Sequence, residues 1–193
     1  MSQTTDPHVV ALCGGLRDAS RTRVAIEQAL DGARAAGGTA ELVDLRDLDL
    51  PPLDPDAPTP PAAAALADTV TDADAVLPGT PNYHGSYTGA LKDALDHLGR
   101  DEFDEQTVGL VEVAAGSHPG PALAHLRAVC RTLDAWTVPL EVAVPDSHSL
   151  IRDDGVTDTD LAERLDRLGE QLVRYAGVAR YPEVAGVPGA HGD

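Results

Sequence analysis

Short apolar runs alternate with amphipathic stretches along this chain. Runs with apolar residues at nearly every position are typical of strands buried on both faces, and they predict strands over residues 8–13, 40–45, 74–80, 107–114 and 138–144. Leucine, valine and alanine at helical spacing predict helices over residues 20–36, 62–71, 88–98, 121–133 and 158–175. Strands that are each followed by a helix imply right-handed crossovers. The pattern therefore predicts an α/β fold, a three-layer doubly wound sheet of five parallel strands.

The length of 193 residues suits one domain, which we place at residues 1–180. Residues 49–61 hold six prolines and are predicted to form an extended loop rather than a helix. Pro78 lies inside the third predicted strand, where its missing N–H argues against regular pairing. The Gly- and Pro-rich end of the chain, residues 181–193, is expected to be a loose tail.

The charge balance is strongly acidic and excludes several kinds of partner. Lys and Arg number 14 against 32 Asp and Glu, a formal net charge of −18. Such a surface repels nucleic acid and anionic lipid, so neither is an expected partner. The acidic residues are spread along the chain, which favours a folded protein with an acidic, halophilic surface suited to a salt-rich cytoplasm.

Compartment signals agree with a cytoplasmic protein. No run approaches 18 consecutive apolar residues, and the first residues lack the basic and apolar regions of a secretory signal. Two cysteines, Cys13 and Cys130, are too few for a disulfide framework or a four-cysteine zinc site. We expect a reduced, cytoplasmic setting and no membrane partner.

The loop after the first predicted strand has the residues of an anion pocket. In a doubly wound sheet, ligands bind beyond the carboxyl ends of the strands. Here Gly14-Gly15 allow a tight turn that opens onto a helix N-terminus, with Ser20 and Thr22 as candidate caps. A span of seven residues in this otherwise acidic chain holds three arginines, Arg17, Arg21 and Arg23. This concentration of positive charge favours phosphate binding. An ordinary capped turn with surface arginines is the alternative.

The same loop excludes three known phosphate chemistries. It lacks the lysine of a Walker A loop, and its glycines do not follow the Gly-x-Gly-x-x-Gly spacing of a dinucleotide fingerprint. A cysteine phosphatase needs an arginine six residues after its nucleophile, where this chain has Ala19 after Cys13. Cys13 is therefore interpreted as a buried strand residue rather than a nucleophile.

Two further loops end strands at the same predicted edge. Residues 80–88 hold two of the four tyrosines, with glycines that let a flat ligand approach the backbone. Tyr83 offers a stacking face, and the N–H groups of residues 82–86 are candidate donors to ring heteroatoms. Residues 114–120 form a third loop of small residues. The alternative for residues 80–88 is a Gly/Ser turn with an exposed tyrosine, and the alternative for residues 114–120 is an ordinary Gly/Ser loop.

Residues 8–145 resemble the NADPH-dependent FMN reductases of the flavodoxin-like fold, a group that includes quinone, chromate and azo-dye reductases. The family's Gly-Ser-x-Arg-x-x-Ser-x-Asn loop is matched by residues 14–22, reading GGLRDASRT. Its longer motif, Pro-Glu-Tyr-Asn-Gly-Ser-x-Pro-Gly-x-Leu-Lys-Asn-x-x-Asp, is matched by residues 81–96, reading PNYHGSYTGALKDALD. The resemblance implies the strand order 2-1-3-4-5.

The resemblance also implies the cofactor and the residues that hold it. FMN would receive hydride from NADPH or NADH and pass it to a small-molecule acceptor such as free flavin or quinone. No side chain need act as acid or base, and no metal is implied. A homodimer or homotetramer is expected, with the 88–98 helix as a contact. The cofactor-binding residues implied are Gly15, Arg17, Ser20, Thr22, Pro81, Asn82, Tyr83, His84, Gly85, Ser86, Ala115 and Gly116.

Departures from the family pattern leave two alternatives open. Gly15 stands for serine and Thr22 for asparagine in the phosphate loop, while Asn82 and His84 replace Glu and Asn beside the flavin, and Thr88 replaces proline. One alternative is a flavodoxin-like electron carrier without NAD(P)H turnover, against which Arg17 argues. The other is a flavin-binding module, or a binding protein that has lost flavin.

Overall fold

The computed structural model describes residues 6–177. The main sheet is built from β1 (His8–Cys13), β2 (Thr39–Asp44), β3 (Ala75–Pro81), β4 (Thr107–Val113) and β5 (Trp136–Val144). The helices are α1 (Arg21–Ala35), a 3-10 turn η1 (Leu45–Asp47), α2 (Pro61–Thr71), α3 (Gly89–Asp96), α4 (Pro121–Thr132), α5 (Ser147–Leu150) and α6 (Thr159–Arg174). A short hairpin consists of β6 (Ile151–Arg152) and β7 (Gly155–Val156).

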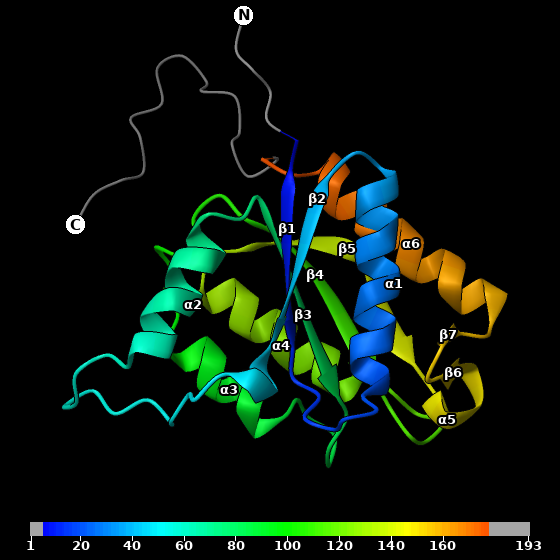
Figure 1. Cartoon of the computed structure of the whole chain (residues 1–193), viewed down its shortest axis with the longest axis horizontal. Helices are drawn as coiled ribbons and strands as arrows, with labels where there is room; N and C mark the ends of the chain where they lie inside the picture. Colours follow the sequence, from blue (N-terminus) through cyan, green and yellow to red (C-terminus); the bar gives the residue numbers. More distant parts are fainter. Residues whose placement is uncertain (1–5, 178–193) are drawn as a thin grey trace, which may run out of the picture.

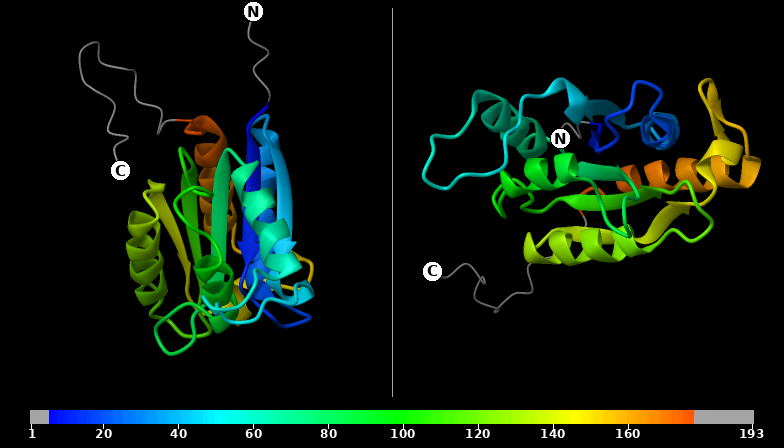
Figure 2. Two further views of the ribbon diagram at one scale, coloured as in Figure 1. Left: turned by 90° about the vertical axis from the view of Figure 1, so that its left-hand side faces the viewer. Right: turned by 90° about the horizontal axis from the view of Figure 1, so that it is seen from below.

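The main sheet has five parallel strands in the order β2-β1-β3-β4-β5. Helices α1 and α6 cover one face, and α2, α3 and α4 cover the other (Figures 1 and 2). The prediction of a doubly wound, flavodoxin-like sheet with the order 2-1-3-4-5 is confirmed. The carboxyl ends of the strands, where the ligand-binding loops were expected, lie at the bottom of Figure 1.

The two faces of the sheet carry separate cores. Successive side chains of a strand point to opposite faces. In β1, Val9, Ala11 and Cys13 belong to the core beneath α1 and α6, and Val10 and Leu12 belong to the core beneath α2, α3 and α4. All five side chains are fully buried, which explains the nearly continuous apolar run in the sequence.

The two cysteines are buried on opposite faces of the sheet. Cys13 of β1 lies in the first core, and Cys130 of α4 lies in the second. Burial raises the pKa of the Cys13 thiol and raises the pKa of Cys130 to about 11. Both thiols therefore stay protonated at neutral pH. Because the thiolate is the nucleophilic form, neither cysteine is suited to act as a nucleophile. The interpretation of Cys13 as a buried strand residue is confirmed.

The structure differs from the prediction mainly after β5. Residues 145–157 form the short helix α5 and the β6–β7 hairpin, for which the apolar pattern gives no signal. Pro78 does lie within the central strand β3, and the paired positions of β3 and β4 skip residues 77 and 78. At the start of α1, Ser20 is the N-cap and Thr22 is a buried residue of the first turn. Thr22 is therefore wrong as a candidate cap. Residues 181–193, the expected tail, lie outside the described residues.

Helices α1 and α6 cross in close contact because glycines face the opposite backbone. A Cβ on Gly169 would lie 1.8 Å from the carbonyl oxygen of Ala29, and one on Gly32 would lie 2.3 Å from that of Asp166. Neither position leaves room for a side chain. The crossing fixes α1, and with it the helix N-terminus that follows the first loop.

Candidate functional site

Three loops meet at the carboxyl edge of the sheet and enclose one pocket. The loops are residues 14–20 after β1, 81–88 after β3 and 114–120 after β4, with the start of α5 beside them. We call this cavity the loop pocket. Its lining residues are Gly15, Leu16, Arg17, Ala19, Ser20, Arg21, Thr22, Pro81, Asn82, Tyr83, Val113, Ala115 and Ser147.

The sequence placed twelve residues at this site, and the structure brings eight of them together in the pocket lining. These eight are Gly15, Arg17, Ser20, Thr22, Pro81, Asn82, Tyr83 and Ala115. The other four do not line the cavity: His84, Gly85, Ser86 and Gly116. The first three form a turn at its rim, and the hydroxyl of Ser86 lies 3.0 Å from Nδ1 of His125.

The first loop leaves most of its main-chain donors free, apart from the N–H of Gly14, which donates to the carbonyl of Gly79. The side chain of Ser20 accepts a hydrogen bond from the N–H of Arg23 at 3.2 Å, which caps α1. Among the described residues, none accepts a hydrogen bond from the amides of residues 15–19. These N–H groups lie before a helix N-terminus, where the helix dipole also favours negative charge. The donor set fits a phosphate group.

The three arginines of this region do not act alike. Arg17 and Arg21 line the pocket, and neither has a carboxylate partner among the described ion pairs. Arg23 instead pairs with Asp44 at 2.8 Å and also bonds the carbonyl of Asp18. Arg17 and Arg21 are therefore the cations of the pocket, and Arg23 is structural.

The glycine at position 15 is required by the packing of the loop. A Cβ there would lie 2.3 Å from Oγ of Ser20 and 3.1 Å from Cβ of Thr22. In this loop conformation a serine at position 15 would displace the helix cap. Gly15, which stands where the family has serine, therefore lets the loop backbone pack closely against Ser20 and Thr22.

Thr88 ties the first loop to the second. Its N–H donates to the hydroxyl of Thr80 at 3.0 Å, and its own hydroxyl donates to the carbonyl of Gly14 at 3.0 Å. Thr88 is buried and also caps α3, accepting from the N–H of Leu91 at 3.3 Å. A proline at this position could donate neither bond, so this departure from the family pattern adds a link between the two loops.

The second loop is a tight turn whose amides are satisfied internally. Tyr83 and Ser86 exchange main-chain hydrogen bonds of 3.0 and 3.1 Å, and His84 and Gly85 between them have φ of 54° and 77°. Two central residues with positive φ are typical of a type I′ turn. The N–H of Asn82 donates to the carbonyl of Val113 at 2.9 Å.

This arrangement corrects one expectation. The N–H groups of residues 82–86 were candidate donors to a ring, but four of the five already have partners. Besides the three main-chain hydrogen bonds just described, the N–H of Gly85 donates to Oδ1 of Asn82 at 3.0 Å. Only the amide of His84 has none among the described residues. The loop therefore offers a shaped surface, including the half-exposed ring of Tyr83, rather than a row of donors.

Free donors occur instead in the third loop. Among described residues, none accepts from the amides of Ala115, Gly116 or Ser117. The carbonyls of Ala114 and Gly116 accept from Ser147 and Asp146, at 3.0 Å each, which fixes the loop against α5. These free amides are the better candidates for bonds to ring heteroatoms.

Sequence reasoning missed the lining residues Leu16, Ala19, Val113 and Ser147, and it missed the buried residue Glu112. Ser147 lines the pocket beyond the carboxyl end of β5. The rule that ligands bind beyond the carboxyl ends of strands predicts such a residue, but only the loops after the first, third and fourth strands were considered. Glu112 is a fully buried carboxylate in β4, directly before the lining residue Val113. A charged residue inside the apolar run TVGLVEV was the available signal, because a buried charge needs partners.

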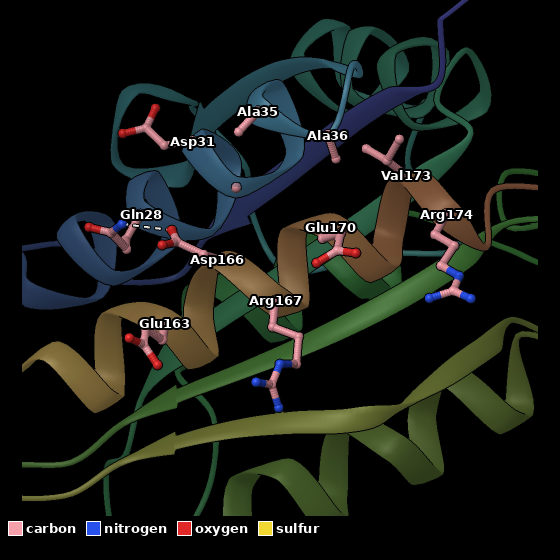
Figure 3. Close-up of a pocket in the computed structure, with 11 residues that line it drawn as sticks. Gln28, Asp31, Ala35, Ala36, Glu163, Asp166, Arg167, Glu170, Val173 and Arg174 are labelled. Carbon is pink, nitrogen blue, oxygen red and sulfur yellow. Dashed lines mark hydrogen bonds between the residues drawn. The ribbon is translucent and has the colours of Figure 1, made fainter.

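A second hollow, between α1 and α6, is a poor candidate (Figure 3). Carboxylates dominate its lining, among them Asp31, Glu163, Asp166 and Glu170. Gln28 binds one of them, with its amide 2.7 Å from Oδ1 of Asp166. No residue of the three loops contributes to it, and its charge would repel a phosphate.

No helix in the described part of the chain is long and apolar enough to cross a bilayer. Among the same residues, no cluster of His, Cys, Asp and Glu could hold a metal ion.

A five-stranded parallel sheet of this order, with helices on both faces, defines the flavodoxin-like fold. Residues 7–149 match the model of the NADPH-dependent FMN reductase family. An FMN-dependent NADPH-azoreductase of Staphylococcus aureus (strain USA300) is 35% identical over 151 residues, which are 74% of this chain and 80% of that protein. The chain belongs to the NADPH-dependent FMN reductase family, and it is an oxidoreductase that uses FMN and NADPH.

Solved structures agree on the fold. An NADH:FMN oxidoreductase superposes with a TM-score of 0.70 at 22% identity, covering 88% of this chain and 90% of that one. A flavoenzyme NAD(P)H:(acceptor) oxidoreductase from Paracoccus denitrificans gives a TM-score of 0.68 at 24% identity, covering 90% and 98%. An archaeal flavodoxin gives 0.63 at 9% identity, covering 88% and 98%.

Proposed function

We propose that FMN binds in the loop pocket, from here on called the flavin pocket, and that the acceptor is a small, flat, conjugated molecule such as free flavin or quinone. One observation carries the placement. Four residues of the first loop with free amides line the same pocket as Tyr83 and the α1 N-cap Ser20, and they are Gly15, Leu16, Arg17 and Ala19. An anion seat beside an exposed aromatic ring matches the two ends of FMN.

In this proposal, the first loop holds the phosphate. The amides of residues 15–19 donate to its oxygens, and Arg17 and Arg21 supply positive charge in a chain of net charge −18. Ser20 keeps the loop in place by capping α1. Because the seat is built from main-chain N–H groups, the loss of the family's serine at position 15 and asparagine at position 22 removes no main-chain donor.

The other two loops hold the ring. Pro81, Asn82 and Tyr83 line the pocket from the second loop, beside the turn of residues 83–86, and Ala115 lines it from the third loop. The free amide of Ala115, which lines the pocket, would stabilise negative charge on the ring. Bound FMN would supply the redox chemistry, accepting hydride from NAD(P)H and delivering it to the acceptor. No side chain is required as acid or base.

The visible spectrum of the purified protein tests the proposal. We expect a yellow protein, or a colourless one that becomes yellow with FMN, and we expect NADPH to bleach the colour under anaerobic conditions. An oxidant panel of free flavin, a quinone and an azo dye then identifies the acceptor; the azo dye is included because of the azoreductase relative. A yellow protein that NADPH does not bleach would be an electron carrier, and one that never takes up FMN would be a binding protein without flavin.

The assembly and the compartment belong to the same proposal. Leu16 and Tyr83, 51% and 50% exposed, both lie at the mouth of the pocket. Large apolar side chains at a mouth are suited to cover by a second subunit, and we propose a homodimer or homotetramer in the cytoplasm, with α3 as a contact. Light scattering of the purified protein measures the mass of the assembly, and a monomer at micromolar concentration would contradict this part.

A further inference from the structure

Glu112 is a carboxylate without any exposed surface, near the end of β4, which pairs with the central strand β3. Its Oε1 accepts from the side-chain amide of Asn82 at 2.5 Å. Its Oε2 accepts from the N–H of Gly120 at 2.9 Å and of Leu123 at 3.1 Å. One buried side chain thus joins the second loop of the flavin pocket to the start of α4.

Glu112 is held by three hydrogen bonds, and no cation among the described residues forms an ion pair with it. A buried carboxylate is costly unless its oxygens are satisfied, and three N–H donors satisfy them here. The N-terminus of α4 adds a favourable dipole. Removing the Asn82 donor would leave the two main-chain donors of Gly120 and Leu123 to hold the charge.

The contact with Asn82 extends further into the loop. While the Nδ2 of Asn82 donates to Glu112, its Oδ1 accepts from the N–H of Gly85 at 3.0 Å. A carboxylate cannot donate and an N–H cannot accept, so both ends of the Asn82 amide are fixed. The result is a continuous path from β4 through Asn82 to the turn at residues 83–86.

We propose that Glu112 is a positioning residue of the flavin pocket: it fixes the 82–86 turn through Asn82 and sets this turn relative to the α4 N-terminus. The inference rests on the proposed placement of FMN. It also assigns a reason to the asparagine at position 82, where the family pattern has glutamate. Glu112 on the neighbouring strand supplies the carboxylate, and Asn82 supplies the amide that faces it.

The buried charge has an electrostatic consequence. Asn82 and Val113, the bonded partner and the chain neighbour of Glu112, both line the pocket. A fixed negative charge this close disfavours the electron-rich, reduced form of a bound flavin. Removing the charge with Glu112→Gln should increase the affinity for reduced over oxidised FMN by about tenfold, equivalent to about 30 mV for a two-electron couple.

An exchange of partners gives the sharpest test. Asn82→Glu alone sets two carboxylates against each other and should weaken FMN binding by about 100-fold. In the double variant Asn82→Glu/Glu112→Gln, the new amide can donate to the new carboxylate while its oxygen accepts from Gly120 or Leu123. We expect the double variant to recover FMN affinity to within about threefold of the wild type, measured by quenching of FMN fluorescence.

Glu141→Gln is the matched control. Glu141 lies on the adjacent strand β5 and pairs with Arg127, and it does not line the flavin pocket. Removing that charge should leave the FMN affinity and the midpoint potential unchanged. If Glu112→Gln matches this control in both quantities, or if the double variant binds FMN no better than Asn82→Glu, the proposal is overturned.

Hydrogen exchange of the flavin-free protein separates this inference from the proposed function. Glu112→Gln should accelerate exchange of the amides of residues 82–86 by at least tenfold, whereas Glu141→Gln should not. If the wild type binds no FMN, the proposed function fails, and exchange alone decides whether Glu112 orders the loop. Should Glu112→Gln not fold, Asn82→Ala breaks the same path while leaving Glu112 its two main-chain donors, and unchanged exchange in that variant would overturn the proposal.

Discussion

The 14–20 loop and the 81–88 loop are neighbours at one edge of the sheet, yet they use their main-chain amides in opposite ways. In the first loop, the amides of residues 15–19 have no acceptor among the described residues. In the second, the amides of Asn82, Tyr83, Gly85 and Ser86 all have one. Thr88, the last residue of the second loop, bonds to Gly14 of the first loop and to Thr80 of β3, and it holds the two loops together.

The difference separates two tasks. Unsatisfied N–H groups beside a helix N-terminus attract an anion and gain most when one binds. A turn with satisfied amides has little to gain from a polar ligand, but it is rigid and presents a fixed surface. The first loop should therefore recognise phosphate, and the second should recognise ring shape. Comparing FMN with riboflavin, which lacks the phosphate, distinguishes the two loops.

Gly15→Ala should have the largest effect on this comparison. The added Cβ would meet Oγ of Ser20 at 2.3 Å, so the cap and the free amides must move. We expect FMN affinity to fall by about 100-fold, or about 2.7 kcal/mol, with little change for riboflavin. Gly89→Ala is the control, because nothing lies within 4 Å of a Cβ there. Fluorescence titration with both flavins measures the effect, and equal losses for both would contradict the division of tasks.

Arg17→Ala should have the next largest effect. It removes a pocket cation that has no described carboxylate partner and leaves the amides in place. A charge-assisted hydrogen bond of about 1.5 kcal/mol corresponds to roughly tenfold weaker FMN binding. Riboflavin binding should not change, and Arg131→Ala, at an exposed position of α4, should affect neither flavin. An effect as large on riboflavin would show that Arg17 contacts the ring instead.

Gly85→Ala should disturb the second loop alone. Gly85 has φ of 77°, and an alanine in this region costs about 1 kcal/mol. We expect about fivefold weaker binding of FMN and riboflavin alike. His84→Asn tests the opposite direction, because asparagine before glycine suits a type I′ turn better than histidine. It should raise the melting temperature slightly, and a fall would contradict the assigned turn.

Salt should have the smallest effect on binding. Added KCl screens the attraction between the first loop and phosphate, so we expect FMN affinity to fall a few-fold from 0.1 to 1 M while riboflavin affinity stays constant. The same salt relieves self-repulsion in a chain of net charge −18, so the melting temperature should rise. A flat or falling melting curve would contradict the expectation of a halophilic surface.

Much of the fold could be predicted because it depends on local pattern. Apolar runs locate the five strands, and Ser20 before a helix locates the cap of α1. The use of the amides could not be predicted, because hydrogen bonds such as that from Asn82 to the carbonyl of Val113 join residues far apart in the sequence. Glu112 was missed because its hydrogen-bond partners also come from other segments, although a charged residue within an apolar strand indicates that partners are present. The hairpin after α5 has strands of two residues, too short for a periodic signal.

The placement of the two cysteines makes the stability of each face of the sheet separately measurable. Cys13 lies on the α1 and α6 side, and Cys130 lies on the α4 side. Each thiol is shielded from alkylating reagents until its own layer opens. Labelling rates at the two positions, resolved by mass spectrometry, would therefore report how often each half of the protein unfolds, without introducing any probe.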